Sequence, residues 1–222
     1  MHRDDHDCGN SDVHTGQLRK GERGSRRRRE PRLLGTSLAE LMVTLGLTAS
    51  MMLVVIPALT TAVHRAALRY AGQHVLQILV EAQNHAATTD RYCGVKFSLV
   101  NGEWWYRLYE DGNGNGILAV DIVSGIDTPI APADLVFPSK GSTHIGYTPG
   151  TVAFDTGIPM TGDESPVNFN RSTICSFSPA GSATPGSVYF TDGVYGAMVR
   201  SSGESGRVRA AFYHGKTGGW QE

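Results

Sequence analysis

Residues 35–63 read GTSLAELMVTLGLTASMMLVVIPALTTAV, and this stretch decides the fold of the 222-residue chain. Between Ser37 and Val63 the only ionisable side chain is that of Glu40. An apolar run of this length spans the hydrocarbon core of a bilayer, which needs about 20 helical residues. The stretch therefore predicts one membrane-spanning helix.

A dense basic cluster precedes the apolar run. It contains Arg19, Lys20, Arg23, Arg26, Arg27, Arg28, Arg29 and Arg32, opposed by Glu22 and Glu30. Basic residues beside a membrane-spanning helix stay on the cytoplasmic side. We therefore expect a single-pass protein with its N-terminus in the cytoplasm and its C-terminal part across the membrane.

Glu40 and the Gly35-Thr36 pair indicate more than a simple anchor. A carboxylate in lipid is costly unless a partner neutralises it. Cleavage between Gly35 and Thr36 would create an N-terminal amine four residues before Glu40. In a bundle of such helices, the amine of one subunit would neutralise Glu40 of the next, so this charge pairing requires an assembly.

The segment GTSLAELM, residues 35–42, resembles the prepilin cleavage and methylation signal of type IV pilins and of the pseudopilins of type II secretion. This resemblance implies cleavage after Gly35, N-methylation at Thr36 and an assembly role for Glu40. It implies as partners the prepilin peptidase and methyltransferase, other pilins or pseudopilins, and the bacterial inner membrane, with the C-terminal domain in the periplasm.

Three further positions bear on the resemblance. Pro57 stands at mature position 22, where members of the family often carry a proline that loosens the helix. Thr36 and Ala39 depart from the usual Phe and larger aliphatic residue. The alternative is a plain anchor or a secretory signal, but a signal has an apolar region of about 7–15 residues, and neither alternative explains Glu40.

The sequence predicts four segments and an α+β fold, with the long helix packed on an antiparallel β-sheet domain in a pilin-like arrangement. These are a cleaved basic leader (1–35), the transmembrane and assembly half of the helix (36–63), its amphipathic half (64–90) and a periplasmic β-rich domain (91–222). The leader has a net charge of +3 and the remainder −4. A mildly acidic exported domain does not favour general nucleic-acid binding.

The helix is predicted to run from Thr36 through Pro57 to about Thr88. Its second half carries apolar residues at three- and four-residue spacing, which predicts packing on the sheet. These residues are Leu68, Ala71, Val75, Ile78, Leu79, Ala82 and Ala86. We expect His64, His74 and His85 to be solvated or hydrogen-bonded residues rather than metal ligands.

After Asp90 the chain changes to short β-rich runs broken by turn residues. The candidate strands are Tyr92–Val100, Trp104–Tyr109, Ile117–Val123, Thr143–Thr148, Thr151–Asp155, Thr173–Ser178, Ser187–Thr191, Val194–Arg200 and Arg207–Tyr213. Asn101-Gly102 and Asp192-Gly193 predict hairpin turns.

This β-rich region is similar, more loosely, to the GspH/FimT minor pseudopilins and minor pilins, through its many short strands and the run Gly206-Arg207-Val208-Arg209 before the chain end. The similarity implies a structural minor subunit of a type II secretion pseudopilus or of a type IV pilus. No Gly-x-Ser-x-Gly nucleophile motif occurs. We expect no enzyme activity and no cofactor apart from the calcium discussed next.

Residues 111–116 read DGNGNG and resemble the first half of a calcium-binding loop, with oxygen ligands at alternate positions. The candidate ligands are Asp111, Asn113, Asn115 and either Asp121 or Asp127. The twelfth position is Ile122 rather than Glu, so the full pattern fails. The alternative, which we favour, is the tip of a hairpin.

Cys93 and Cys175 are the only cysteines outside the leader. In a domain exported to an oxidising compartment they are candidates for a disulfide, the alternative being two separate buried thiols. Arg200, Arg207, Arg209 and Lys216 form the one basic concentration of the mature part. They suggest an alternative function, a minor pilin that binds DNA for uptake, against a simpler reading as a solvated sheet face.

Overall fold

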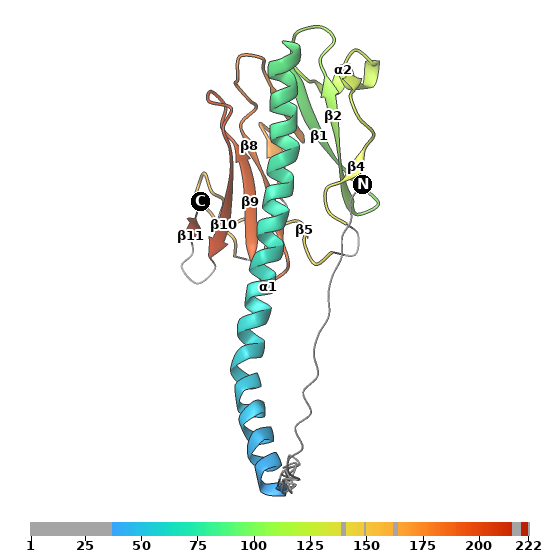
Figure 1. Ribbon diagram of the computed structural model, residues 1–222. Helices are drawn as coiled ribbons and strands as arrows, with labels where there is room; N and C mark the ends of the chain where they lie inside the picture. The colour runs from blue at the N-terminus through green and yellow to red at the C-terminus, as the bar shows by residue number, and fades with distance from the viewer. Residues whose placement is uncertain (1–36, 139–140, 149, 162–163, 215–218, 222) are drawn as a thin grey trace, which may run out of the picture. The chain divides into compact units, whose positions relative to one another are not determined.

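The computed structural model (Figure 1) describes residues 37–222 except 139–140, 149, 162–163, 215–218 and 222. Gly35 and Thr36, the predicted processing site, lie outside the described residues, as does the leader. The chain divides into two compact units, residues 1–47 and 48–222. The second unit contains the whole β-rich part.

Helix α1 spans Leu38–Thr89, 52 residues. Ser37 caps its first turn, because its hydroxyl accepts the backbone N–H of Glu40 at 3.2 Å. Pro57 lies inside the helix without ending it. Its ring has no N–H to donate to the preceding turn, while its carbonyl accepts the hydroxyls of Thr60 and Thr61 at 3.0 Å. The predicted long helix is confirmed.

The two halves of α1 differ in burial. The large apolar side chains from Leu38 to Val63 are all exposed. By length and composition, α1 is long and apolar enough to cross a membrane. The second half buries the predicted stripe, with Gly72 added to it. That stripe packs on the β-domain, in agreement with the amphipathic spacing.

Two antiparallel sheets lie on either side of α1 in Figure 1. The first contains β1 (Cys93–Val100), β2 (Glu103–Glu110), β3 (Thr128–Pro129), β4 (Asp134–Leu135) and β7 (Ile174–Phe177). The second contains β5 (His144–Ile145), β6 (Val167–Phe169), β8 (Gly186–Thr191), β9 (Gly196–Ser201), β10 (Val208–His214) and β11 (Gly219–Gln221). A long helix followed by antiparallel sheets confirms the α+β class.

The segment 117–123 was predicted as a strand and instead forms the short helix α2 (Ala119–Ser124). A short apolar run does not distinguish helix from strand. Here Gly125, at φ 78°, ends a single helical turn. Val120 and Val123 point to solvent, whereas Ile122 packs on the cluster of Tyr109, Ile117 and Ile174.

Other strand predictions were also corrected. The predicted strand 143–148 shortens to β5, and 151–155 retains one bridge, between Val152 and Pro159. The predicted two-residue turn at Asp192-Gly193 is a four-residue loop, because Thr191 pairs with Gly196. The Asn101-Gly102 hairpin is confirmed, with φ of 53° and 83° at the two residues.

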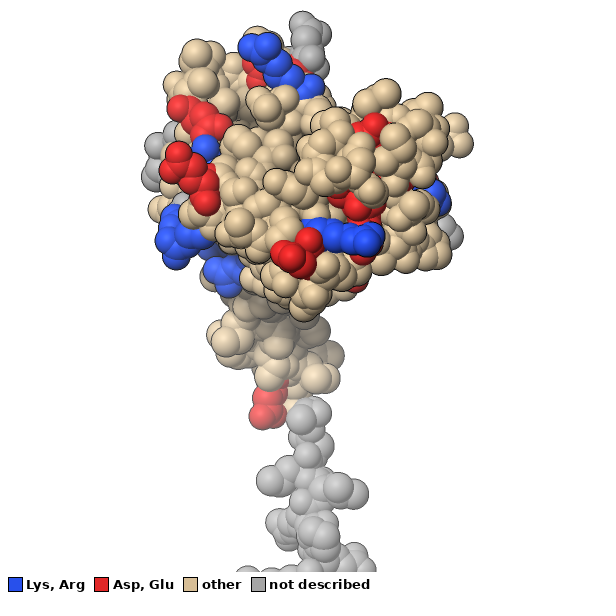
Figure 2. Space-filling model, turned by 90° about the horizontal axis from the view of Figure 1, so that it is seen from above, with Lys and Arg blue, Asp and Glu red and all other residues tan. Residues whose placement is uncertain are grey.

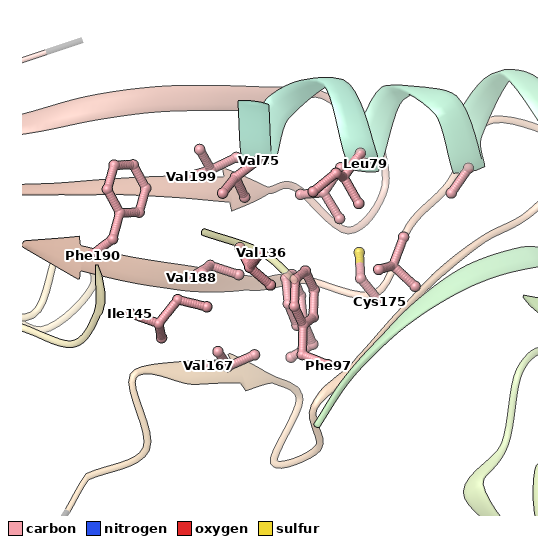
Figure 3. Close-up of a cluster of buried hydrophobic side chains, with 14 of the residues drawn as sticks. Val75, Leu79, Phe97, Val136, Ile145, Val167, Cys175, Val188, Phe190 and Val199 are labelled. Carbon is pink, nitrogen blue, oxygen red and sulfur yellow. The ribbon is translucent and has the colours of Figure 1, made fainter. Parts of the chain in front are cut away.

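One hydrophobic core joins the helix to both sheets (Figure 3). Val75 and Leu79 enter it from α1, Phe97 from β1 and Phe190 from β8. The ring of Phe97 stacks on that of Phe169, with centroids 6.0 Å apart. This shared core holds the second half of α1 as part of the β-domain.

Candidate functional site

The exposed apolar face of α1, from Leu38 to Val63, is the main candidate site. Glu40 lies exposed in the first turn, where the positive end of the helix dipole favours a carboxylate. A helix that is hydrophobic all round belongs in lipid or among other helices, since the contact of its apolar side chains with water is unfavourable. This segment therefore needs a partner surface that the rest of the described chain does not supply.

His64 joins the end of the apolar run to the β-domain. Its Nδ1 atom lies 2.8 Å from Oδ2 of Asp192, whose side chain is fully buried. The other oxygen of Asp192 accepts the backbone N–H groups of Val194 and Tyr195 at 2.9 and 2.7 Å. Sequence reasoning predicted a satisfied histidine but not this partner, because the Asp192-Gly193 pair resembled an ordinary tight turn.

A second histidine and a carboxylate join the far end of α1 to β2. The Nε2 atom of His85 lies 2.8 Å from Oε2 of Glu110, and an Arg91 guanidinium nitrogen lies 3.0 Å from Oε1. The hydrogen bond from His85, followed by that from Arg91, lowers the pKa of Glu110 below its usual 4.5. The two histidine pairs thus hold the packed half of the helix at both ends.

A Glu110→Gln variant is expected to be less stable than the wild type above pH about 4.5. Because the folded-state pKa of Glu110 is depressed, its contribution is fully present above the usual pKa and is lost as the pH falls through the lowered value. The gap between the two proteins should therefore close in acid. Urea unfolding followed by tryptophan fluorescence, from pH 3 to 7, measures it. A gap that stays constant over this range would contradict the charged pairing with His85 and Arg91.

The segment after β2 contains three buried carboxylates, Asp111 and Asp127 outside regular structure and Asp121 in α2. Asp111 Oδ1 accepts the backbone N–H groups of Asn113 and Gly114 at 2.8 and 2.9 Å, and Oδ2 that of Gly116 at 2.8 Å. The Asp111 carboxylate therefore holds the backbone of residues 113–116 in its turn conformation through three hydrogen bonds.

The other two carboxylates of the segment are also hydrogen-bonded. The side-chain amides of Asn113 and Asn115 donate to Asp121 Oδ2 at 3.3 and 3.0 Å. Asp127 accepts the backbone N–H groups of Gly112 and Leu118. Among the described residues no group of three or more His, Cys, Asp or Glu is arranged to hold a metal. The predicted calcium ligands therefore lie in one segment, residues 111–127, and their carboxylates accept hydrogen bonds from protein N–H groups.

Replacing Asp111 with Asn is expected to lower the free energy of unfolding by about 1–3 kcal/mol, because one buried N–H donor then faces an amide nitrogen. The matched control is Asp90→Asn at an exposed position with φ of 54°, which Asn also tolerates. Thermal unfolding in calcium and in chelator compares both variants with the wild type. A wild-type midpoint that rises with calcium, and no longer does so in Asp111→Asn, would instead support the metal-site hypothesis.

Cys93 and Cys175 lie on adjacent strands as free, buried thiols. The register pairs Cys93 with Phe177 and Cys175 with Val95, so the two cysteines are diagonal neighbours. Diagonal neighbours are about 7–8 Å apart, beyond the Cα separation of a disulfide, about 4.4–6.8 Å. The disulfide considered from the sequence is therefore not formed in the structure, and the alternative of two buried thiols describes it.

Burial raises the pKa of both thiols to about 12, with the nearby Glu110 carboxylate adding to the effect at Cys93. Both cysteines should therefore resist alkylation in the native protein and react once it is unfolded in urea. Intact mass after iodoacetamide treatment, with and without urea, measures this. A protein from oxidising conditions that takes up no label at these two positions in urea would contradict the free-thiol state.

The positive charge of the predicted basic patch is partly neutralised by a nearby carboxylate. Arg200 forms an ion pair with Asp155 and lies over the ring of Phe154, 5.2 Å from its centroid. Arg209 stands directly opposite Arg200 in the β9–β10 register, and Arg207 precedes β10. Lys216 lies outside the described residues. Figure 2 shows basic and acidic side chains interspersed over the face in view rather than gathered in one basic area.

Comparison of the chain with known protein families, curated proteins and solved structures found no match in any of the three. Its function is therefore inferred from its own residues.

Proposed function

We propose that this chain is a structural minor subunit of a type II secretion pseudopilus or type IV pilus, of the GspH/FimT kind. A prepilin peptidase cleaves it after Gly35, and the new N-terminus at Thr36 is methylated. The protein waits in the inner membrane with its β-domain in the periplasm, and then joins the fibre through helix α1.

The observation that carries this proposal is the division of one continuous helix. The half from Leu38 to Val63 exposes its apolar side chains, while the half from Leu68 onward buries one face against the two sheets. A simple anchor needs only about 20 helical residues, yet α1 has 52. Continuity of the helix into the core suits a subunit that must be pulled out of lipid and packed laterally without separating from its domain.

The mechanism is assembly rather than turnover. Apolar side chains that face lipid in the membrane pack against neighbouring helices in the fibre. The Thr36 amine of one subunit neutralises Glu40 of another, which offsets the cost of burying either charge alone. The β-domain presents its loops and sheet faces to other subunits.

The N-terminal mass of protein isolated from membranes tests this proposal. We expect a mature species that starts at N-methylated Thr36 and is lost in Gly35→Ala. The matched control is Gly46→Ala, which lies in the same apolar segment and whose added methyl would meet no atom within 4 Å. An intact leader in the wild-type protein would exclude the pilin-like function and leave an ordinary anchored β-domain.

The second candidate function is a minor pilin that binds DNA through Arg200, Arg207, Arg209 and Lys216. The observation that favours it is the cross-strand pairing of Arg200 with Arg209, which places two cations side by side. Contacts to phosphate make affinity fall steeply with salt. Arg209→Gln should then weaken DNA binding and flatten that salt dependence, while binding that is insensitive to salt would exclude this candidate.

A further inference from the structure

A cavity of about 330 Å³ lies beside the point where α1 enters the β-domain. Arg65, Leu68 and Arg69 line it from the helix. The opposite wall includes Tyr195 in the β8–β9 loop, and Phe212 and Tyr213 in β10. The pairing of His64 with Asp192 fixes the loop that holds Tyr195 in this wall. The lining thus combines two arginines with apolar and aromatic side chains, and it also includes Gln221 of β11.

The two arginines point their charges to the same side of the helix. They are four residues apart, which places them one above the other on one face. Within the part of the chain that the structure describes, no Asp or Glu forms an ion pair with either guanidinium. Toward the described carboxylates these two lining residues are therefore cations without an ion-pair partner, and their hydrogen-bond donors suit an oxyanion.

The position of the cavity along the helix identifies the source of that oxyanion. Arg65 follows Val63, the last residue of the apolar run, by two positions, which is about 3 Å along a helix axis. When residues 38–63 lie in a bilayer, the guanidiniums reach the headgroup layer. Tyr70, 75% exposed, stands at the same level, where tyrosine is enriched in membrane proteins.

An apolar path leads from the cavity along the helix toward the membrane. Ala58 and Val54 precede Arg65 by seven and eleven residues, so they share its face of the helix. Both are exposed. A lipid whose phosphate lies at Arg65 and Arg69 can lay an acyl chain along these residues. Thr61 lies on the same face between them, and its hydroxyl donates to the Pro57 carbonyl.

We infer that this cavity binds the phosphate group of a membrane phospholipid. Arg65 and Arg69 donate to the phosphate oxygens, and Leu68 and Phe212 contact the glycerol and ester region. The inference rests on the insertion of residues 38–63 into the membrane, one part of the proposed function, and not on cleavage after Gly35. The bound lipid holds the β-domain against the membrane surface until the subunit is extracted.

Lipid binding to the full-length chain in a phosphate-free detergent tests this inference. Native mass spectrometry measures adducts with phosphatidylglycerol, phosphatidylethanolamine, diacylglycerol and inorganic phosphate. We expect both phospholipids to bind, and the Arg65→Gln/Arg69→Gln double variant to bind them at least about tenfold more weakly, since charge-assisted hydrogen bonds are lost. The control Arg91→Gln/Arg171→Gln removes two exposed arginines outside the cavity and should bind phospholipid as the wild type does.

Three outcomes would overturn the inference. The first is phospholipid binding by the double variant as strong as that by the control. The second is diacylglycerol binding as strong as phospholipid binding. The third is inorganic phosphate that binds alone and displaces the lipid, which would make this a site for free anions. The Arg65→Lys/Arg69→Lys variant keeps both positive charges, so it should retain part of the phospholipid binding. This variant distinguishes an effect of the lost charges from an effect of misfolding. The N-terminal mass measured on the same samples reports processing independently, because a chain that keeps its leader still inserts.

Discussion

Replacing Phe97 with alanine is expected to lower the free energy of unfolding by about 3–5 kcal/mol, the cost of emptying an aromatic site in a packed core. Phe97 is 1% exposed and stacks on Phe169, so the cavity would open where the first sheet meets the second. Urea unfolding followed by tryptophan fluorescence measures the loss, since all three tryptophans lie in the β-domain.

Leu99→Ala is the matched control for this experiment. Leu99 lies two residues further along β1, on the same face of the strand, but is 59% exposed. Its replacement should cost no more than about 0.5 kcal/mol. Equal losses at the two positions would show that the helix and the two sheets do not share the core described here.

Gly186→Ala is expected to cost about 3 kcal/mol, at the upper end for overpacking, because the atoms in the way belong to the backbone. A methyl group at Gly186 would collide with the carbonyl oxygen of Asn168 and the Cα atom of Phe169 in β6. Neither can move without separating β6 from β8. The midpoint of thermal unfolding should fall accordingly.

Gly219→Ala in β11 is the corresponding control, because an added methyl there would meet no atom within 4 Å. It should leave the midpoint nearly unchanged. Neither glycine variant should alter the N-terminal mass, since the proposed processing site lies at Gly35. A Gly186→Ala protein as stable as the Gly219→Ala protein would contradict the close approach of β6 and β8.

The long helix was predictable because its signals are local. The apolar run sets the first half, and the three- and four-residue spacing from Leu68 to Ala86 sets the second. Strand β1 and strand β2 were predictable for the same reason, since alternation and the Asn101-Gly102 turn act within about ten residues. Where the local signal was short, as in residues 117–123, helix and strand could not be distinguished.

The candidate site likewise has a part that local sequence signals predict and a part that depends on the tertiary structure. The composition of residues 35–63 predicts the assembly surface, and the basic leader predicts its orientation. The partner of His64 was not predictable, because Asp192 is 128 positions away and only the path of β8 brings it near. The offset between Cys93 and Cys175 likewise depends on the register of β1 with β7.

By itself, the sequence determined a helix long and apolar enough to span a membrane, its continuation as an amphipathic stripe, and the α+β class. Only the tertiary structure decided that both sheets share one core with α1, that the two cysteines remain apart, and that Arg65 and Arg69 face a cavity with Tyr195 and Phe212. The physical reason is the separation along the sequence over which each kind of interaction acts. Periodicity and hydropathy act between neighbours along the chain, whereas register and cavities arise from contacts between segments that only folding brings together.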